Sequence, residues 1–223
     1  MEGAHGRRSL AHKFHPYFGG LRKSASIPKL RETRMPRCFW CTDDPLYIAY
    51  HDHEWGVPQR DPQALFELLL LEGFQAGLSW ITVLKKRERY REVLFGFDVQ
   101  RVAALSDAYI DDTLMHDPGI IRNRLKLRAA RQNAQAWLKL EDPVALLWSF
   151  VGGQPKVNHF SERAQVPAVT HEAEAMSKAL KKAGFTFVGP TICYAYMQAT
   201  GMVMDHTTDC DRYAELLMTK HHQ

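Results

Sequence analysis

The longest apolar run of the sequence, residues 65–86, constrains the fold more than any other feature. Six of the seven residues from position 65 to position 71 are leucine or phenylalanine, which would make a helix apolar around its whole circumference. This pattern is typical of a helix buried on several sides. Glu72 follows directly. Because an unpaired buried carboxylate costs several kcal/mol or takes up a proton, Glu72 either reaches solvent, caps a helix or forms the polar floor of a pocket.

Glycines and aromatic residues interrupt the run after this acid. Gly73 and Gly77 weaken a helix, while Phe74 and Trp80 add large rings. The segment therefore predicts a helix, a glycine-containing turn and a second helix.

Composition places the chain among globular proteins. Its 223 residues are 45% apolar, 24% charged and 11% aromatic, which is ordinary for a domain with a substantial core. No apolar run reaches the roughly 18 residues that span a bilayer, and the start of the chain lacks the hydrophobic segment of a signal peptide. We therefore expect a cytoplasmic protein that does not associate with membranes.

The net charge of +4 is concentrated at the start of the chain. Residues 1–34 carry eight Lys or Arg against two acids, which leaves the rest of the chain slightly acidic. This segment also lacks apolar periodicity, so we predict a basic, disordered extension at residues 1–34, a helical body at residues 35–218 and a short tail at residues 219–223. The body has no globally basic surface, and any affinity for nucleic acid must come from local patches.

Helix signals recur along the body, whereas no convincing strand pair or internal repeat is found. Asp44 with Pro45, and Asp61 with Pro62, have the order of an N-cap and a first helical residue. Further helices are predicted between residues 98 and 112, after a Pro-Gly turn at residues 118–119, at 143–151, at 171–183 and from about residue 190 into the 205–210 region. The predicted fold class is all-α.

Two pairs of potential metal ligands lie near the two ends of the body. They are Cys38, His51, His206 and Cys210. The last two are four residues apart, a spacing that places two ligands on one face of a helix. Two cysteines and two histidines complete a tetrahedral zinc shell without an open position for water, so such a zinc would be structural. Cys41, which forms a C-x-x-C pair with Cys38, and His53 compete for the same roles.

A set of aromatic residues is a candidate pocket wall. These residues are Trp40, Tyr47, Tyr50, Trp55 and Trp80. Rings at such spacings are more often part of a core than of a pocket. Taken with Glu72, however, they supply flat faces and one acceptor for an exocyclic amine, a combination that suits a nucleobase.

A candidate phosphate site follows the Pro-Gly turn. A helix with five basic residues begins there, and its basic residues are Arg122, Arg124, Lys126, Arg128 and Arg131. Turn amides beside a helix N-terminus form an anion site, to which basic side chains add charge. We predict DNA-backbone contacts from Gly119, Arg122, Arg124 and Lys126. The segment is similar to a helix-hairpin-helix element, although it lacks the second glycine of the usual hairpin.

Several strings of the body closely resemble the 3-methyladenine DNA glycosylase I (Tag) family. They include DPLYIAYHDHEWGVP, FELLLLEGFQAGLSWITVLKKRE, GIIRNRLK, SKALKKAGFTFVGPTICYAYMQATG and the terminal DH-x3-C. The resemblance runs from about Met35 to Cys210. It implies a helix-hairpin-helix glycosylase fold whose N- and C-terminal ends are joined by a structural Zn²⁺. It also implies a monomeric N-glycosyl hydrolase that flips out and releases 3-methyladenine from alkylated double-stranded DNA.

The resemblance also implies roles for particular residues. The zinc ligands correspond to Cys38, His51, His206 and Cys210, and Cys41 is then a departure without an assigned role. Glu72 and Tyr50 correspond to residues that contact the flipped base, and Trp80 to the ring that stacks on it. Trp40, Tyr47 and Trp55 complete the wall. Gly77 and Leu78 correspond to the loop that fills the vacated space in the duplex, with Leu78 as the apolar wedge.

Two other function classes remain as alternatives. A zinc-dependent hydrolase would need an open coordination position, which a shell of four protein ligands does not offer. In a non-catalytic, zinc-stabilised DNA-binding module the rings would be only core, and Glu72 within the apolar run argues against this. No aspartate stands at a position that compels the catalytic role usual in the wider glycosylase superfamily, so the group that orients the attacking water is open.

Overall fold

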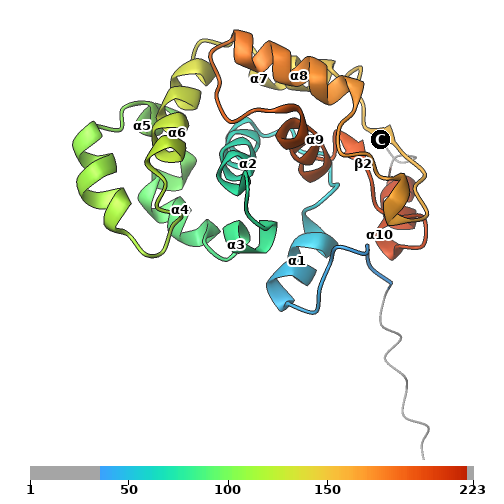
Figure 1. Ribbon diagram of the computed structural model, residues 1–223. Coiled ribbons are helices and arrows are strands. Elements are labelled where there is room, and N and C mark those ends of the chain that lie inside the picture. Colours follow the sequence, from blue (N-terminus) through green and yellow to red (C-terminus); the bar gives the residue numbers. More distant parts are fainter. Residues whose placement is uncertain (1–35, 220–223) are drawn as a thin grey trace, which may run out of the picture. The chain divides into compact units, whose positions relative to one another are not determined.

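Helix α2 (Pro62–Gln75) carries the apolar run and lies at the centre of the helices (Figure 1). It begins where the sequence predicts, because the Asp61 side chain accepts a hydrogen bond from the Ala64 amide and Pro62 occupies the first turn. Every residue from 65 to 74 is buried. The prediction of a helix buried on several sides is confirmed, and burial of each Leu or Phe contributes about 1.5–3 kcal/mol.

Three other helices pack rings against α2. The Phe66 ring meets Trp137 of α6 (Arg124–Trp137), with centroids 5.3 Å apart. Phe74 stacks on Tyr90 of α4 (Arg87–Val93) at 4.4 Å. On α9 (Pro190–Ala199), the Tyr196 hydroxyl donates to a backbone carbonyl of α2 over 3.1 Å. These contacts fix α2 as the support on which the other elements are placed.

A turn separates α2 from the short helix α3 (Trp80–Leu84), as predicted. Gly77 lies in this turn with a φ of 78°, a left-handed conformation that glycine adopts without steric cost. The turn therefore brings Trp80, at the start of α3, close to the end of α2.

The remaining elements are mostly short helices. They are α1 (Pro45–His53), η1 (Phe95–Phe97), α5 (Val99–Ala103), the π-helical turn η2 (Tyr109–Thr113), η3 (Leu114–His116), α7 (Pro143–Ser149), η4 (Arg163–Gln165), α8 (His171–Lys182) and α10 (Asp211–Thr219). In Figure 1, α4, α5 and α6 lie on one side of α2, and α1 and α10 lie on the other side of the body.

The chain after α9 departs from the predicted course. The helix ends at Ala199 instead of continuing into the 205–210 region, and a two-residue strand, β2 (Val203–Met204), follows. This strand pairs in parallel with β1 (Lys156–Val157), so the fold is mostly helical but not purely so. Gly201 adopts a φ of 67°, a left-handed conformation that ends an α-helix. A Cβ atom at this position would also lie 2.5 Å from the backbone of Val57 and Pro58.

The computed structural model describes residues 36–219, which belong to one compact unit, Met35–Gln223. The predicted basic extension at residues 1–34, and all but the first residue of the predicted tail, lie outside the described residues. Within residues 36–219, no helix combines the length and the apolar character that a membrane span requires.

Candidate functional site

A cavity of about 220 Å³ lies among α1, α2, α3, α9 and the segment before α1. Its volume corresponds to several water molecules, each of which takes up about 30 Å³ in the liquid. The structure brings all six predicted recognition residues into its wall: Trp40, Tyr47, Tyr50, Trp55, Glu72 and Trp80. Residues from four separate segments of the chain thus converge on one space.

The rings of the wall are in mutual contact. Trp40 packs against Trp55 and Tyr47 with centroids 4.8 and 5.1 Å apart, and Tyr50 packs against Trp80 at 5.3 Å. The indole nitrogens of Trp40 and Trp80 are buried, and neither has a hydrogen-bond partner among the described residues. What the wall offers a ligand is therefore flat apolar faces, which suit a planar heterocycle.

Glu72 neither caps a helix nor reaches solvent. Its side chain lies near the end of α2 and is only 3% exposed. No hydrogen bond to its carboxyl group occurs within the part of the chain that the structure describes. Burial raises the pKa of Glu72 to about 8, because the charged form loses its hydration without gaining a partner. A cation in the pocket would supply that missing partner.

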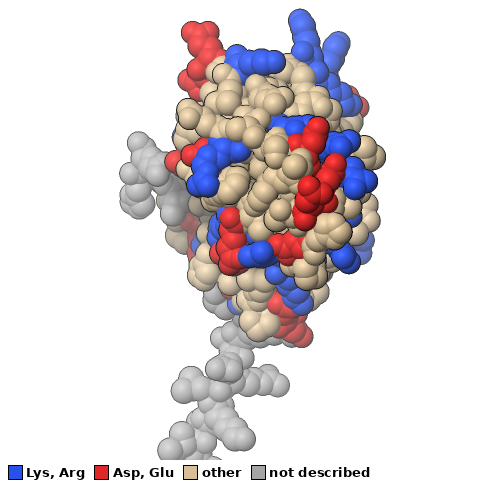
Figure 2. Space-filling model, turned by 90° about the vertical axis from the view of Figure 1, so that its left-hand side faces the viewer, with Lys and Arg blue, Asp and Glu red and all other residues tan. Residues whose placement is uncertain are grey.

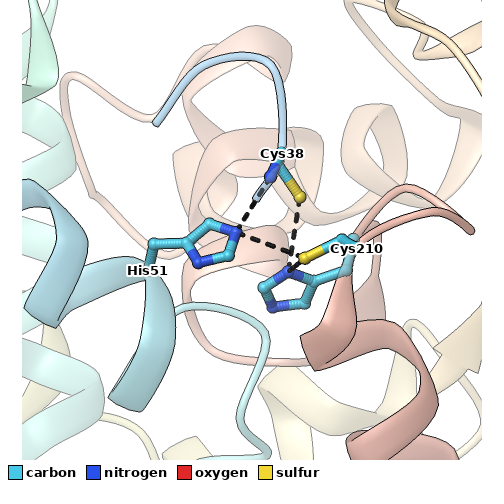
Figure 3. Close-up of side chains that lie close together, drawn as sticks. Cys38, His51 and Cys210 are labelled. Atoms are coloured by element: carbon cyan, nitrogen blue, oxygen red, sulfur yellow. Dashed lines mark hydrogen bonds between the residues drawn. The ribbon is translucent and has the colours of Figure 1, made fainter. Parts of the chain in front are cut away.

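The four predicted metal ligands form one buried cluster (Figure 3). One potential ligand atom from each of Cys38, His51, His206 and Cys210 lies within 4.8 Å of the others. The sulfur-to-nitrogen distances are 3.4 Å for Cys38 with His206 and 3.5 Å for Cys210 with either histidine. Bonds of about 2.3 Å to sulfur and about 2.0 Å to nitrogen at tetrahedral angles separate the two by about 3.5 Å. The donor set and its spacing therefore fit a four-coordinate metal ion.

The outer nitrogen of each histidine is also engaged. His51 Nδ1 lies 2.7 Å from a carboxylate oxygen of Asp52, and His206 Nε2 lies 3.0 Å from the carbonyl oxygen of Trp55. Such partners fix the tautomer of a histidine that binds metal. The hydrogen bond with Cys38 lowers the pKa of the Cys210 thiol, assisted by both imidazoles, which favours the thiolate form that binds metal.

Tertiary contacts distinguish the predicted ligands from their competitors. Cys41 lies outside the cluster, and its thiol points to the carbonyls of Thr42 and Tyr47. His53 is exposed. The expectation that His206 and Cys210 share a helix face is wrong, because both precede α10 in the segment after β2. They meet through the turns of that segment.

The metal-ligand cluster supports the aromatic wall. The Trp40 ring lies 5.1 Å from the His51 ring, and the Trp55 ring lies 4.7 Å from the His206 ring. The His206 imidazole also bonds to the Trp55 backbone. Two of the rings that line the cavity therefore pack against the histidines of this cluster.

The loop between α2 and α3 presents an exposed leucine beside the cavity. Leu78 is 40% exposed, while its amide donates to Gln75 O over 2.7 Å and its carbonyl accepts from Gln75 Nε2 over 3.2 Å. A Cβ added at Gly77 would have no atom within 4 Å. Hydrogen bonds with Gln75 therefore hold the base of the loop in place, while the tip at Gly77 has free space around it.

Lys126 does not take the place predicted for it. Its side chain is only 7% exposed, and Nζ donates to the carbonyls of Phe74 and Ala76 over 2.7 and 2.6 Å. Burial lowers the pKa of this ammonium group. Lys126 therefore caps the end of α2 and anchors the loop, and it is not available to DNA phosphates.

The other predicted backbone contacts are placed differently from one another. Arg122 is exposed and has no ion-pair partner among residues 36–219, whereas Arg124 pairs with Asp111 at 2.7 Å. The Gly119 amide donates to Asp117 Oδ1 over 2.7 Å, and a Cβ at Gly119 would lie 2.6 Å from Arg89 Cγ. Figure 2 shows acidic and basic side chains mixed over the α4–α6 side. Arg122 is the predicted residue of this segment whose charge is open to a phosphate.

Sequence reasoning missed several residues of the cavity wall. They include Phe39, Gln75, Val166, Gln198 and Asp205. These residues come from separate segments and share no spacing signal. Local indications existed for three of them, because Phe39 precedes Trp40, Gln75 follows Glu72 by three residues and Asp205 precedes His206.

The chain is similar to proteins of one family over most of its length. Residues 40–213 match the family model described as methyladenine glycosylase. DNA-3-methyladenine glycosylase 1 of Escherichia coli strain K12 is 52% identical over 183 residues, which cover 80% of this chain and 97% of the relative. The crystal structure of a 3-methyladenine DNA glycosylase I (TAG) has a TM-score of 0.78 at 51% identity and covers 79% of this chain and 98% of its own. A structure of 3-methyladenine DNA glycosylase I (TAG) from Staphylococcus aureus, which concerns 3-methyladenine recognition, has a TM-score of 0.76 at 41% identity. The match covers 79% of this chain and 96% of that structure's chain.

Proposed function

The chain belongs to the methyladenine glycosylase family, and we propose that it is a DNA glycosylase that hydrolytically releases 3-methyladenine from alkylated DNA. The observation that carries the proposal is the meeting, in one cavity, of mutually packed aromatic rings and a buried carboxyl group without a hydrogen-bond partner among the described residues. Flat faces suit a planar base, and the carboxyl group can accept a hydrogen bond from its exocyclic amine. The names of the relatives support the same substrate.

The charge of the substrate simplifies the chemistry. A 3-methylated adenine in DNA is a cation, so its bond to the sugar is already weak. When the bond between N9 and C1′ breaks, its electron pair moves to the base, which leaves as a neutral molecule. A water oxygen forms the new bond to C1′ and gives up a proton to solvent. Because the base needs no protonation, the site has only to select the cation and to stabilise the positive charge that passes to the sugar as the bond breaks.

In this proposal each cavity residue has a distinct role in recognition of the base. Trp80 stacks on the base and Tyr50 contacts it, while Trp40, Tyr47 and Trp55 complete the wall. Each ring that faces the cation contributes about 0.5–2 kcal/mol. Glu72, protonated in the empty pocket near neutral pH, loses its proton when the cation arrives, because a nearby positive charge lowers the pKa of a carboxyl group. The pocket thereby gains a negative charge where the base carries a positive one.

We further propose that the metal-ligand cluster holds Zn²⁺, bound by Cys38, His51, His206 and Cys210. Two thiolates and two imidazoles are the donors that zinc prefers in structural sites, and they leave no open position for water. When bound, the metal supplies folding energy and joins the two ends of the body. The ligands also hold Trp40 and Trp55 in place, so their function is to shape the pocket.

Contacts with DNA follow from the exposed groups near the cavity. We propose that the loop at Gly77 and Leu78 enters the space left by the flipped nucleotide, in the manner of other apolar wedges. Arg122 contacts a phosphate, and Arg124 can do so by exchanging its carboxylate partner Asp111 for DNA. We also propose that residues 118–126 act as a helix-hairpin-helix element on the DNA backbone. The substrate is then double-stranded DNA, and the protein acts as a monomer inside the cell.

We expect Leu78→Ala to weaken binding to duplex DNA with one flipped-out nucleotide by roughly 10-fold. The substitution removes the apolar group that replaces the lost stacking, while the ties of the loop through Gln75 and Lys126 remain. Fluorescence anisotropy with a duplex that contains a stable abasic-site analogue measures the effect.

Leu138→Ala is the matched control for the wedge. Leu138 is also an exposed leucine, but it follows the C-terminal end of α6. Its replacement should leave affinity within 2-fold of the original protein. Equal affinity of the Leu78 variant and the unmodified protein would contradict the wedge role.

Release of bases from methylated duplex DNA tests the function directly. The DNA is treated with a methylating agent, incubated with the purified protein, and the free bases are identified by chromatography and mass spectrometry. We expect 3-methyladenine to appear with time and nothing to be released from untreated duplex. Tight binding to the methylated duplex without any base release would instead favour the non-catalytic DNA-binding module.

A further inference from the structure

A second carboxylate, that of Asp205, lines the same cavity as Glu72. Its side chain is 3% exposed. Oδ1 accepts a hydrogen bond from Asn158 Nδ2 over 2.7 Å, and Oδ2 accepts from Gln198 Nε2 over 2.8 Å and from the Tyr194 hydroxyl. A carboxylate can accept about four hydrogen bonds, so three donors leave one acceptor position for a further group.

The small parallel strand pair places this network. Asn158 directly follows β1 and Asp205 directly follows β2, and the Asn158 amide donates to the Met204 carbonyl over 3.2 Å. The register therefore sets the two side chains next to each other. The other two donors, Tyr194 and Gln198, are four residues apart on α9, a spacing that puts them on one face of the helix. Two independent elements thus hold the Asp205 carboxylate rigidly at the cavity wall.

The two carboxyl groups of the cavity have opposite surroundings. The described residues offer no hydrogen bond to the Glu72 carboxyl group, whereas three donors satisfy Asp205. Pairs of carboxyl groups in unlike environments take different roles in catalytic sites. Three donors hold the Asp205 carboxylate in place at the cavity wall, whereas no described residue holds the Glu72 carboxyl group by a hydrogen bond.

We propose that Asp205 is a specificity-determining residue, whose fixed negative charge makes the pocket prefer a cationic base to a neutral base of the same shape. The inference rests on the proposed function and deepens it, because the family substrate carries the positive charge. Unmodified adenine, which is neutral and abundant in DNA, would gain nothing from this charge. Discrimination then begins with electrostatics and does not depend on the fit of one methyl group.

The network permits a nearly isosteric test. In Asp205→Asn the new amide oxygen can still accept from Tyr194 and Gln198. Asn158 can turn its amide group so that its oxygen accepts from the new NH₂. The substitution therefore removes the charge with little loss of hydrogen bonding. Tyr194→Phe is the matched control, since it removes one donor and keeps the charge.

Two small probes separate charge from shape. The 3,9-dimethyladenine cation has a permanent positive charge, and 9-methyladenine is neutral with nearly the same outline. Calorimetric titration gives the dissociation constants of both for each variant. For Asp205→Asn we expect affinity for the cation to fall 10- to 100-fold and affinity for the neutral base to change less than 3-fold. For Tyr194→Phe the ratio of the two affinities should stay within 3-fold of the original.

A charge exchange covers the case in which Asp205→Asn does not fold. The double variant Asp205→Asn with Asn158→Asp keeps one carboxylate and one amide in the pair but moves the charge from a cavity-lining position to its neighbour. Preference for the cation should again fall. Because Asp205 precedes a metal ligand, the metal content of every variant is measured, and unchanged content shows that the effect does not arise at the cluster.

The outcomes separate this inference from the function it rests on. Failure of the unsubstituted protein to release 3-methyladenine from methylated duplex overturns the function. Release by the unsubstituted protein together with an unchanged cation preference in Asp205→Asn, or in the charge exchange, overturns only the role of Asp205. Equal weakening for both probes would make Asp205 a structural residue, and absence of a cation preference in the unsubstituted protein would overturn the inference as well.

Discussion

Glu72→Gln should lower the rate constant for 3-methyladenine release by about 100- to 1000-fold and, at alkaline pH, raise the stability of the fold. The first effect follows because glutamine cannot become an anion near the positive charge that passes from the base to the sugar as the bond breaks. The loss of one group that stabilises such charge in an active site costs about this much. Single-turnover release from methylated duplex measures it. Unchanged release would remove Glu72 from the site.

The second effect follows from the raised pKa of Glu72. Burial holds this pKa at about 8, against 4.5 for the ordinary group. Between these values the folded protein keeps a proton that the unfolded chain has lost, so the free energy of unfolding decreases as pH rises through the window. Each pKa unit corresponds to about 1.4 kcal/mol, which gives a few kcal/mol in total. Glutamine does not titrate and escapes this loss.

Thermal unfolding at several pH values shows the effect. The melting temperature of Glu72→Gln relative to the unsubstituted protein should rise between pH 5 and pH 9, by several degrees at the upper end. Glu67→Gln is the matched control on the same helix, since Glu67 forms ion pairs with Arg87 and Arg91 at 2.6 and 2.8 Å. Its replacement should lower stability and leave base release intact. A pH-independent difference for Glu72→Gln would contradict a buried, protonated carboxyl group.

Removal of the metal should unfold the end of the body that carries the aromatic wall. We expect close to one Zn²⁺ per chain, and a strong chelator should lower the melting temperature by more than about 10 °C, because structural zinc sites bind with about 10–16 kcal/mol of free energy. Without the ion, two thiols and two imidazoles would remain buried around an empty space. Base release should disappear together with the fold and return when zinc is restored.

Cysteine variants make the metal test specific. Cys210→Ser should lose the ion and most of the stability, whereas Cys41→Ser should keep both, because Cys41 lies outside the cluster. Folded, active protein without metal would refute the structural zinc. Loss of activity at chelator concentrations that leave the fold intact would favour a zinc-dependent hydrolase instead.

Local sequence signals were enough to predict the helical framework around α2. The Asp-Pro pairs at residues 44–45 and 61–62 place two helix starts correctly, because capping and the fixed φ of proline act within a few residues. The apolar run likewise identified the buried helix, since periodicity is a local property. Residue type and spacing identified the candidate rings and ligands, and the resemblance to a family assigned their roles.

Which of these residues meet, and whether they are buried or exposed there, depends on the folded arrangement of the whole chain. Nothing local separates Cys38 from Cys41 or His51 from His53. The burial of Lys126 against the end of α2 depends on a contact more than 50 residues away in sequence. The same holds for Asp205, whose donors come from a strand pair and a helix. The charge, burial and hydrogen bonding of a side chain depend on all the residues that surround it in the folded protein. A sequence pattern shows only the residues that are close to it along the chain.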